Sequence, residues 1–323
     1  MFAYLFPSKY WGLIGPIFTL ITTYIALRRQ NKYLPTDGGR AFAVDGASAK
    51  GKPTSAGIIF ISCMIVSLAL FTTLTIKEAG VYLFVLCAAI FGFLDDKHNW
   101  SAMKKALTDI FVALGSAVLA ALLFPRTIYI FSLNIYFTIP FPLYIVLAAL
   151  LVWLSINFTN ASDGVDGLCG GMSMVATITF ILMTVITAGP TSMIQSAMIY
   201  LVPVLGVYLW FNCHPSTLLM GDSGSQAIGV LLALFAMATA NPFSYIIICL
   251  PLICDGGSSL LKLAVLRATK KKLDPLKGIR TPLHDHCRKE LGWANQKVTE
   301  RFILLHVAIN SIYILILLVR CRI

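Results

Sequence analysis

Long apolar runs dominate this sequence and restrict what the chain can fold into. Ten such runs, separated by polar residues or by Gly and Pro, lie at 11–27, 55–74, 79–94, 106–124, 140–156, 168–188, 194–211, 225–240, 243–266 and 301–319. A helix of about 20 apolar residues crosses the hydrocarbon core of a bilayer. Only 12% of the residues are charged, and the mean hydropathy is +0.83. We therefore predict an all-α polytopic membrane protein with about ten transmembrane helices, in which residues 1–323 form a single integral membrane domain.

Lysine and arginine are distributed unevenly between the connections. An even number of spans puts both termini on one side, so the connections fall into two alternating sets. One set contains most of the 25 basic residues, and the other contains only Lys9, Lys77, Arg126, Arg320 and Arg322. Because cytoplasmic loops carry the excess of Lys and Arg, the first set is predicted to face the cytoplasm and both termini to face outside. Topology then accounts for the net charge of +11, and no nucleic-acid partner is expected.

The connection at 125–139 differs in composition from the others. It is rich in β-branched and aromatic residues, and Asn134 lies near its centre. These residues favour extended backbone, and Asn favours a tight turn. The segment is therefore predicted to be a small extracytoplasmic hairpin, or else a simple connector.

Five aspartates gather at the cytoplasmic ends of three predicted spans. Asp95 and Asp96 end the third span, Asp163 and Asp166 follow the fifth, and Asp222 follows the seventh. Carboxylates at the edge of hydrocarbon are unfavourable unless cations, water or a metal compensate them. Adjacent carboxylates at a helix end suit Mg²⁺, which takes one or two carboxylates together with substrate phosphate. The five residues thus predict a functional site at the cytoplasmic face rather than ordinary solvated loops.

Two amides and then two acids stand at every third position after the fifth span. The positions are Asn157, Asn160, Asp163 and Asp166, and a glycine directly follows each of the two acids. On a continuous helix this spacing would keep all four side chains on one face. Amides beside acids, with glycines that allow close approach of the backbone, are suited to bind a nucleobase and a ribose.

Two further polar stretches belong to the same face. Asn212 ends a span, and Asp222 lies at the start of the next, where a helix N-terminus favours phosphate and a carboxylate could hold a bridging metal. A long basic loop contains His284 and His286. No further Cys or His that could complete a zinc site with them is evident, so the two imidazoles are expected to contact phosphate oxygens. His306, inside the tenth run, is expected to be a structural residue.

These stretches, in this order and at these separations, resemble the polyprenyl-phosphate N-acetylhexosamine-1-phosphate transferase superfamily across most of the chain. The run Gly51-Lys52-Pro53-Thr54-Ser55-Ala56-Gly57 and the loop end Glu290-Leu291-Gly292-Trp293 are most similar to its bacterial phospho-N-acetylmuramoyl-pentapeptide transferase branch. The resemblance implies a cytoplasmic-face active site in the bacterial plasma membrane. There, undecaprenyl phosphate would attack the β-phosphate of UDP-N-acetylmuramoyl-pentapeptide, release UMP and form the first lipid-linked peptidoglycan precursor. It also implies a homodimer and inhibition by nucleoside analogues.

The resemblance also assigns roles to individual residues. Its catalytic candidates are Asp95, Asp96, Asp222 and His284, of which Asp222 and Asp95 would bind Mg²⁺. Asp96 would position the metal or accept a proton, although a phosphate nucleophile is already ionised and needs no strong base. Substrate-binding candidates are Asn157, Asn160, Asp163, Asp166, Asn212 and Leu219, the histidines His284 and His286 for diphosphate or sugar, and Lys50, Lys52 and Lys105 for phosphate.

Two departures from the family pattern affect these assignments. The branch has three consecutive histidines where this chain has His284-Asp285-His286, and the spacing to Gly292 is one residue longer. The chain also has Lys52 where Thr is usual, so that either Lys50 or Lys52 could take the role of the family lysine.

Two other functions compete with this one. A sister transferase would use UDP-N-acetylglucosamine with the same lipid, and the loop ending at Gly292 and Trp293 favours the muramoyl branch. A cation-coupled transporter would explain Asp109 and Asp255 inside spans, but the acids cluster at one mouth and no inverted repeat is evident. If the protein is a transferase, Asp255 would be either a structural residue, with Lys262 as a candidate partner, or part of a groove for the prenyl chain.

Overall fold

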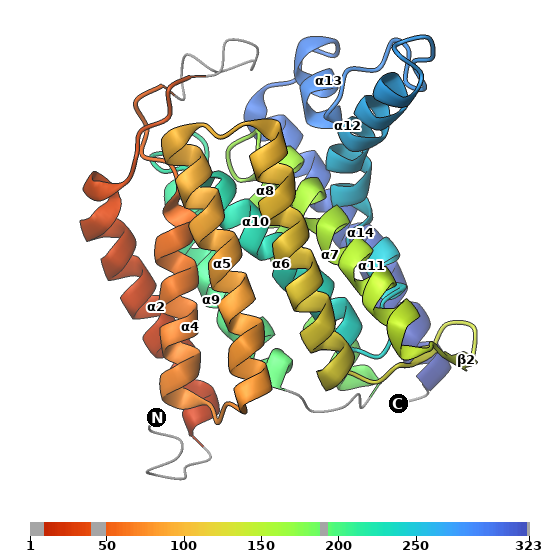
Figure 1. The fold of residues 1–323 in the computed structure, drawn as a ribbon. Coiled ribbons are helices and arrows are strands. Elements are labelled where there is room, and N and C mark those ends of the chain that lie inside the picture. Colours follow the sequence, from red (N-terminus) through yellow and green to blue (C-terminus); the bar gives the residue numbers. More distant parts are fainter. Residues whose placement is uncertain (1–9, 40–49, 188–192, 322–323) are drawn as a thin grey trace.

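The computed structural model describes residues 10–39, 50–187 and 193–321, and helices make up most of this part of the chain. Within these described residues, eight helices are long and apolar enough to cross a membrane. They are α2 (Trp11–Gln30), α5 (Ile76–His98), α6 (Ala102–Leu123), α7 (Phe141–Ser162), α8 (Leu168–Ile186), α9 (Met193–Asn212), α10 (Gly221–Ala238) and α14 (Asn295–Cys321). They form one bundle (Figure 1). The predicted all-α polytopic membrane fold is thus confirmed.

The two remaining apolar runs form helices of a different kind. The second run forms α4 (Ala56–Phe71), which has only 16 residues. The ninth run is broken at Cys249 into the short α11 (Ser244–Ile248) and α12 (Leu250–Ala268), which begins with a proline in its first turn. A proline there has no amide hydrogen to continue the preceding helix. Ten apolar runs therefore give eight long spanning helices, one short helix and one broken helix.

Short elements complete the fold. A turn of 3₁₀ helix, η1 (Asn31–Tyr33), follows α2, and α13 (Leu283–Lys289) lies in the basic loop. Strands β1 (Thr127–Ile130) and β2 (Ile135–Thr138) pair antiparallel, with Ile130 opposite Ile135. Asn134 adopts a left-handed φ of 55° in the turn between the strands, a conformation that Asn tolerates better than most residues. The expected hairpin is confirmed.

Helix α10 forms the centre of the bundle. Nearly all of it is buried, and it packs against α4, α5, α7 and α8. Glycines permit this close packing: a Cβ added to Gly57 of α4 or to Gly92 of α5 would overlap the backbone of α10, and one added to Gly229 would overlap the backbone of α7. Small residues allow helix backbones to approach closely in membrane proteins. The packing fixes the start of α10 against the end of α5.

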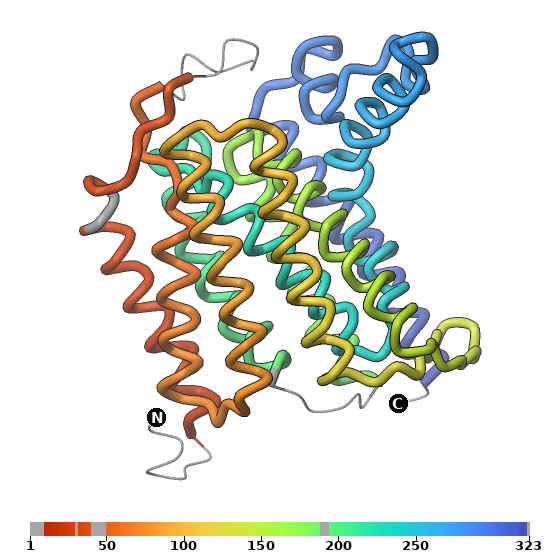
Figure 2. Tube along the Cα trace, in the orientation of Figure 1, coloured from red at the N-terminus to blue at the C-terminus, as the bar shows by residue number. Residues whose placement is uncertain are grey.

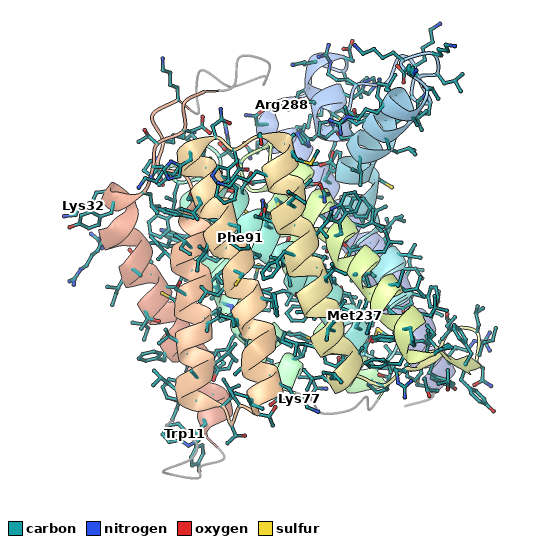
Figure 3. The ribbon with its side chains drawn as sticks, viewed as in Figure 1. Trp11, Lys32, Lys77, Phe91, Met237 and Arg288 are labelled. Carbon is teal, nitrogen blue, oxygen red and sulfur yellow. The ribbon has the colours of Figure 1, made fainter. Side chains whose placement is uncertain are left out.

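The two ends of the bundle differ in chemistry. We call the end where α5 finishes and α10 begins the carboxylate end, and the opposite one the hairpin end. Lys32 and Arg288 lie at the carboxylate end, whereas Trp11 and Lys77 lie at the hairpin end (Figure 3). The first residues of α2 and the last of α14 both lie at the hairpin end (Figure 2), as an even number of crossings requires. Of the basic residues used to predict topology, Lys9, Arg40 and Arg322 lie outside the described residues.

Candidate active site

A cavity of about 770 Å³ opens at the carboxylate end of the bundle. Segments that are far apart in the sequence line it, among them the ends of α5 and α7, the start of α10 and the C-terminal end of α13. Ten of the predicted site residues contribute to its wall: Lys52, Asp95, Asp96, Lys105, Asn160, Asp163, Asp166, Asn212, Leu219 and Asp222. The structure therefore brings most of the candidates to one place.

Two carboxylates share one lysine in this cavity. Lys105, in the first turn of α6, has its Nζ 3.2 Å from Oδ2 of Asp95 and forms an ion pair with Oδ2 of Asp222. Asn160 of α7 donates from Nδ2 to the other oxygen of Asp222 at 2.7 Å. The ammonium group shows that a cation can be held between these carboxylates. A divalent metal could use the same oxygens, since Mg²⁺ needs only one or two protein carboxylates when a substrate phosphate supplies further ligands.

The set of metal-binding side chains is nevertheless small. Within the described residues, no three His, Cys, Asp or Glu side chains converge at metal-binding distances. Asp95 and Asp222 fit a Mg²⁺ ion that shares its coordination with water and phosphate, and they do not fit a closed structural site. Two carboxylates with room for water and phosphate are thus a donor set that suits a hard divalent cation.

Asp96 has a different environment from Asp95 although the two are adjacent. Its Oδ2 accepts a hydrogen bond from Oγ of Ser55 at 2.5 Å, and its Oδ1 accepts one from the backbone N–H of Asp222 at 3.1 Å. Free N–H groups in the first turn of a helix favour an anion. Asp96 therefore connects the start of α4 to the start of α10, and it also faces the cavity.

The prediction that Asn157, Asn160, Asp163 and Asp166 share one helical face is wrong for the two acids. Helix α7 ends at Ser162, and Asp163 and Asp166 lie in the non-helical connection to α8. Both still reach the cavity, as Asn160 does. Asn157 does not line it, and its Nδ2 donates to the backbone carbonyl of Trp153 at 2.8 Å. The connection, rather than a continuous helix, brings the two acids to the site.

Asp166 accepts several hydrogen bonds from the segment after α9. Ser216 donates to it from its backbone N–H at 3.0 Å and from Oγ at 2.7 Å, and Nδ1 of His214 lies 3.1 Å away. Burial alone would raise the pKa of this carboxyl, but the bonds from Ser216 and the charge of Lys52 outweigh burial and lower the pKa below its ordinary value. Asp166 is therefore ionised at neutral pH.

Asn212 and Leu219 tie the segment after α9 to other parts of the cavity wall. Oδ1 of Asn212 accepts from the N–H of Gly167 at 2.8 Å, and its Nδ2 donates to the carbonyl of Leu218 at 2.8 Å. The N–H of Leu219 donates to the carbonyl of Pro53 at 2.9 Å. Asn212 thus supports the cavity wall through its side chain, and Leu219 supports it through its backbone.

Of the two candidate lysines, only Lys52 reaches the described cavity wall. Its Nζ donates to Oγ of Ser216 at 3.0 Å. Lys50 is exposed and lies outside the described lining.

The histidine loop is arranged differently from the sequence-based expectation. His284 is buried and lies outside the cavity wall, and its Nδ1 is 2.9 Å from Oδ2 of Asp255. Lys262, the candidate partner of Asp255, instead has its Nζ 3.3 Å from Asp274. The partner of Asp255 is therefore His284 of the basic loop, and not Lys262, which lies on the same helix as Asp255. His286 also lies outside the lining, where Nδ1 accepts a long contact of 3.4 Å from the N–H of Arg280.

His306 is buried, and its Nε2 lies 2.6 Å from the carbonyl of Ile248. This carbonyl lies at the break between α11 and α12. The contact agrees with the structural role expected for His306.

Several residues of the cavity wall were not predicted. Arg288, Asn99, Trp100 and Asn295 line it, and Ser55 holds one of its carboxylates. Arg288 follows His284 by four residues on a helix, so helical spacing could have indicated that the two side chains share a face. Ser55 belongs to the run from Gly51 to Gly57 that carries the family resemblance, and the sequence has no comparable signal for Asn99, Trp100 and Asn295.

Comparisons with known proteins agree with this arrangement. The sequence model of glycosyl transferase family 4 matches residues 78–240. A phospho-N-acetylmuramoyl-pentapeptide-transferase of Treponema pallidum (strain Nichols) is 33% identical over 303 residues, which cover 88% of this chain and 83% of that protein. Proteins of the same name from Borrelia garinii subsp. bavariensis and Sulfurimonas denitrificans are 29% and 28% identical, over 88% and 83% of this chain and 87% and 81% of their own lengths. The chain therefore belongs to the phospho-N-acetylmuramoyl-pentapeptide-transferase family.

Proposed function

We propose that this protein transfers phospho-N-acetylmuramoyl-pentapeptide from UDP-N-acetylmuramoyl-pentapeptide to undecaprenyl phosphate at the cavity of the carboxylate end. The products are UMP and the first lipid-linked peptidoglycan precursor. One observation carries the proposal: Asp95, Asp96 and Asp222 meet at one cavity with Lys105, beside the Asp163 and Asp166 connection. A transferase acting on a diphosphate needs this combination of cation-holding carboxylates and a polar nucleoside pocket.

One group of residues would bind the diphosphate of the donor, and another would bind its uridine and ribose. Asp95 and Asp222 would hold Mg²⁺, which supplies positive charge to the diphosphate when bound. Lys105 already lies between these carboxylates and would move toward phosphate oxygens. Asn160, Asp163, Asp166 and Asn212, with Leu219, would form the wall for uridine and ribose. Asn157 and Lys50 would contribute only indirectly, because they lie outside this wall.

The lipid phosphate needs little chemical activation. A phosphate monoester is already ionised near neutral pH, so positioning and neutralisation of charge matter more than a general base. Asp96 would orient the start of α10 and hold the cluster, since Ser55 and the Asp222 N–H both donate to it. No enzyme-bound phosphoryl intermediate is required.

The topology and assembly follow from the same proposal. The carboxylate end would face the cytoplasm, where the UDP-linked donor is made, and both termini would face outside, in a bacterial plasma membrane. Residues 1–323 would act as a single transferase domain, and two copies would form a homodimer. Nucleoside analogues of the donor would inhibit by entering the pocket at Asp163 and Asp166.

An assay of UMP release tests the proposal. Purified protein in detergent would be given undecaprenyl phosphate with UDP-N-acetylmuramoyl-pentapeptide or, in parallel, UDP-N-acetylglucosamine, with and without Mg²⁺. Mg²⁺-dependent release from the muramoyl donor alone, abolished in Asp222→Asn and retained in Asp274→Asn, is the expected result. Asp274 is the matched control because it pairs with Lys262, outside the described cavity wall. Release from UDP-N-acetylglucosamine alone would move the protein to the sister activity, and no release from either donor would contradict the proposal.

A further inference from the structure

Helix α13 buries two polar side chains within a loop that is otherwise mostly exposed. His284 is 2% exposed and Arg288 is 7% exposed. They are four residues apart on the helix and so point to the same side. Only Arg288 reaches the cavity wall. The two side chains thus have different surroundings although they share one face.

His284 is held tightly from both sides. Its backbone N–H donates to Oδ1 of Asp255 at 2.8 Å, and its Nδ1 lies 2.9 Å from Oδ2 of the same carboxylate. Asp255 is fully buried in α12. A carboxylate accepts hydrogen bonds only, so Nδ1 carries the proton. Nε2 faces Gly164, where an added Cβ would overlap it. This histidine therefore fixes α13 to α12 and to the connection after α7.

Arg288 lines the cavity and also contacts the segments beside it. Its Nη1 is 3.4 Å from the carbonyl of Gly164 and 3.5 Å from Oδ1 of Asp285. Both distances are at the long end for hydrogen bonds to nitrogen. A guanidinium group keeps its charge at any physiological pH, and its planar donors match the oxygens of a phosphate.

The charges around the cavity explain why such a cation is needed there. Six carboxylates line the described wall, those of Asp37, Asp95, Asp96, Asp163, Asp166 and Asp222. The cations of the same wall are Lys52, Lys105 and Arg288. Lys105 interacts with two of the carboxylates, and Lys52 lies beside Ser216. A diphosphate entering this cavity would be repelled unless cations on its other side compensate.

We propose that Arg288 binds the diphosphate of the UDP-linked donor, and that Asp255 and His284 are positioning residues that hold its helix at the cavity. This inference rests on the proposed function and deepens it: it moves the anion contact of the histidine loop from His284 to Arg288. The chemistry is recognition of a phosphate oxygen by a guanidinium group that also contacts the backbone of the nucleoside pocket at Gly164.

Binding of two ligands to the detergent-purified full chain separates a phosphate contact from a structural role. Calorimetry with UDP and with uridine, both in Mg²⁺ buffer, would compare the wild type with Arg288→Gln. The variant is expected to lose at least roughly tenfold in affinity for UDP and less than about twofold for uridine, and Arg288→Lys is expected to be intermediate. Arg280→Gln is the matched control, because Arg280 lies in the same loop, half-exposed, and pairs with Glu290.

Three results would overturn the assignment. An equal loss of UDP and uridine affinity would show that Arg288 only supports the pocket at Gly164. Unchanged affinity for both would show that it contacts neither. An unchanged affinity for UDP with a raised KM for the full muramoyl donor would assign Arg288 to a carboxylate of the peptide. Failure of the wild type to bind UDP or release UMP would instead contradict the proposed function itself.

The positioning pair has its own test. Asp255→Asn keeps the shape of the side chain and removes its charge, so it is expected to raise KM for the donor about tenfold with a much smaller change in kcat. Asp255→Glu restores the charge and is expected to recover part of the loss. A purely structural role would lower thermal stability and affect UDP and uridine equally. That outcome, or a loss in kcat alone, would overturn the positioning role.

Discussion

At the scale of single residues, the carboxylate of Asp96 depends on one hydroxyl group. Ser55 donates to it at 2.5 Å and is fully buried. Because a hydrogen bond to a charged group is worth about 1.5–3 kcal/mol, Ser55→Ala is expected to reduce kcat roughly tenfold or more. Ser67→Ala is the matched control, since Ser67 is also fully buried and its hydroxyl donates to the carbonyl of Cys63 in its own helix. Equal turnover in the two variants would contradict this role.

Lys105 competes with a metal for the same carboxylates. Since its ammonium group lies between Asp95 and Asp222, Lys105→Met is expected to bind Mn²⁺ about tenfold more tightly, because a like charge has been removed from the site. Turnover should fall in the same variant. Electron paramagnetic resonance would measure free Mn²⁺, with Lys104→Met as control, because Lys104 lies over the ring of Trp100. Weaker binding in Lys105→Met would show that the lysine does not compete with the metal.

Asp166 should make the free energy of unfolding depend on pH, and the sign of this dependence follows from its lowered pKa. A carboxyl with a lowered folded pKa contributes stability that is present at neutral pH and lost as pH falls through that pKa. The difference in free energy of unfolding between wild type and Asp166→Asn should therefore stay constant down to about pH 4 and shrink below it. Thermal unfolding at several pH values would measure this difference. Its disappearance between about pH 6 and 5 would contradict the lowered pKa.

At the scale of helices, the contact between α5 and α10 sets the geometry of the cluster. A Cβ on Gly92 would overlap the backbone at Asp222, whereas one on Gly206 of α9 would meet no atom within 4 Å. Overpacking typically costs about 1–3 kcal/mol. Gly92→Ala is therefore expected to lower the thermal unfolding temperature and to abolish most UMP release, and Gly206→Ala to change neither. Similar behaviour of the two variants would mean that this contact does not position Asp222.

At the scale of the whole molecule, the two ends should face opposite sides of the membrane. Cys213 is exposed near the carboxylate end, and Tyr136 is exposed in the hairpin. A maleimide that cannot cross the membrane is expected to label Tyr136→Cys in intact cells but to label Cys213 only after permeabilisation. For the first measurement, Cys213 and the exposed Cys254 would be replaced by Ser. The reverse pattern would place the cavity outside.

Much of the architecture is predictable because hydropathy and turn preference are local properties. The lengths of the apolar runs predicted the helices, and the β-branched segment with Asn134 predicted the hairpin. The expected convergence of Asp95, Asp163 and Asp222 also followed from local information, since each lies at the end of a span that must reach the same surface.

A polytopic helical membrane protein with its acids gathered at one end can thus be predicted from local sequence patterns. Which side chains face the cavity and which support it depends instead on long-range packing. Asp255 and His284 meet across 29 residues, and Arg288 reaches the backbone of Gly164 across 124. Such pairs depend on how α12, α13 and the end of α7 pack together, which no local pattern encodes. For that reason His284 was predicted at the site where the structure places Arg288.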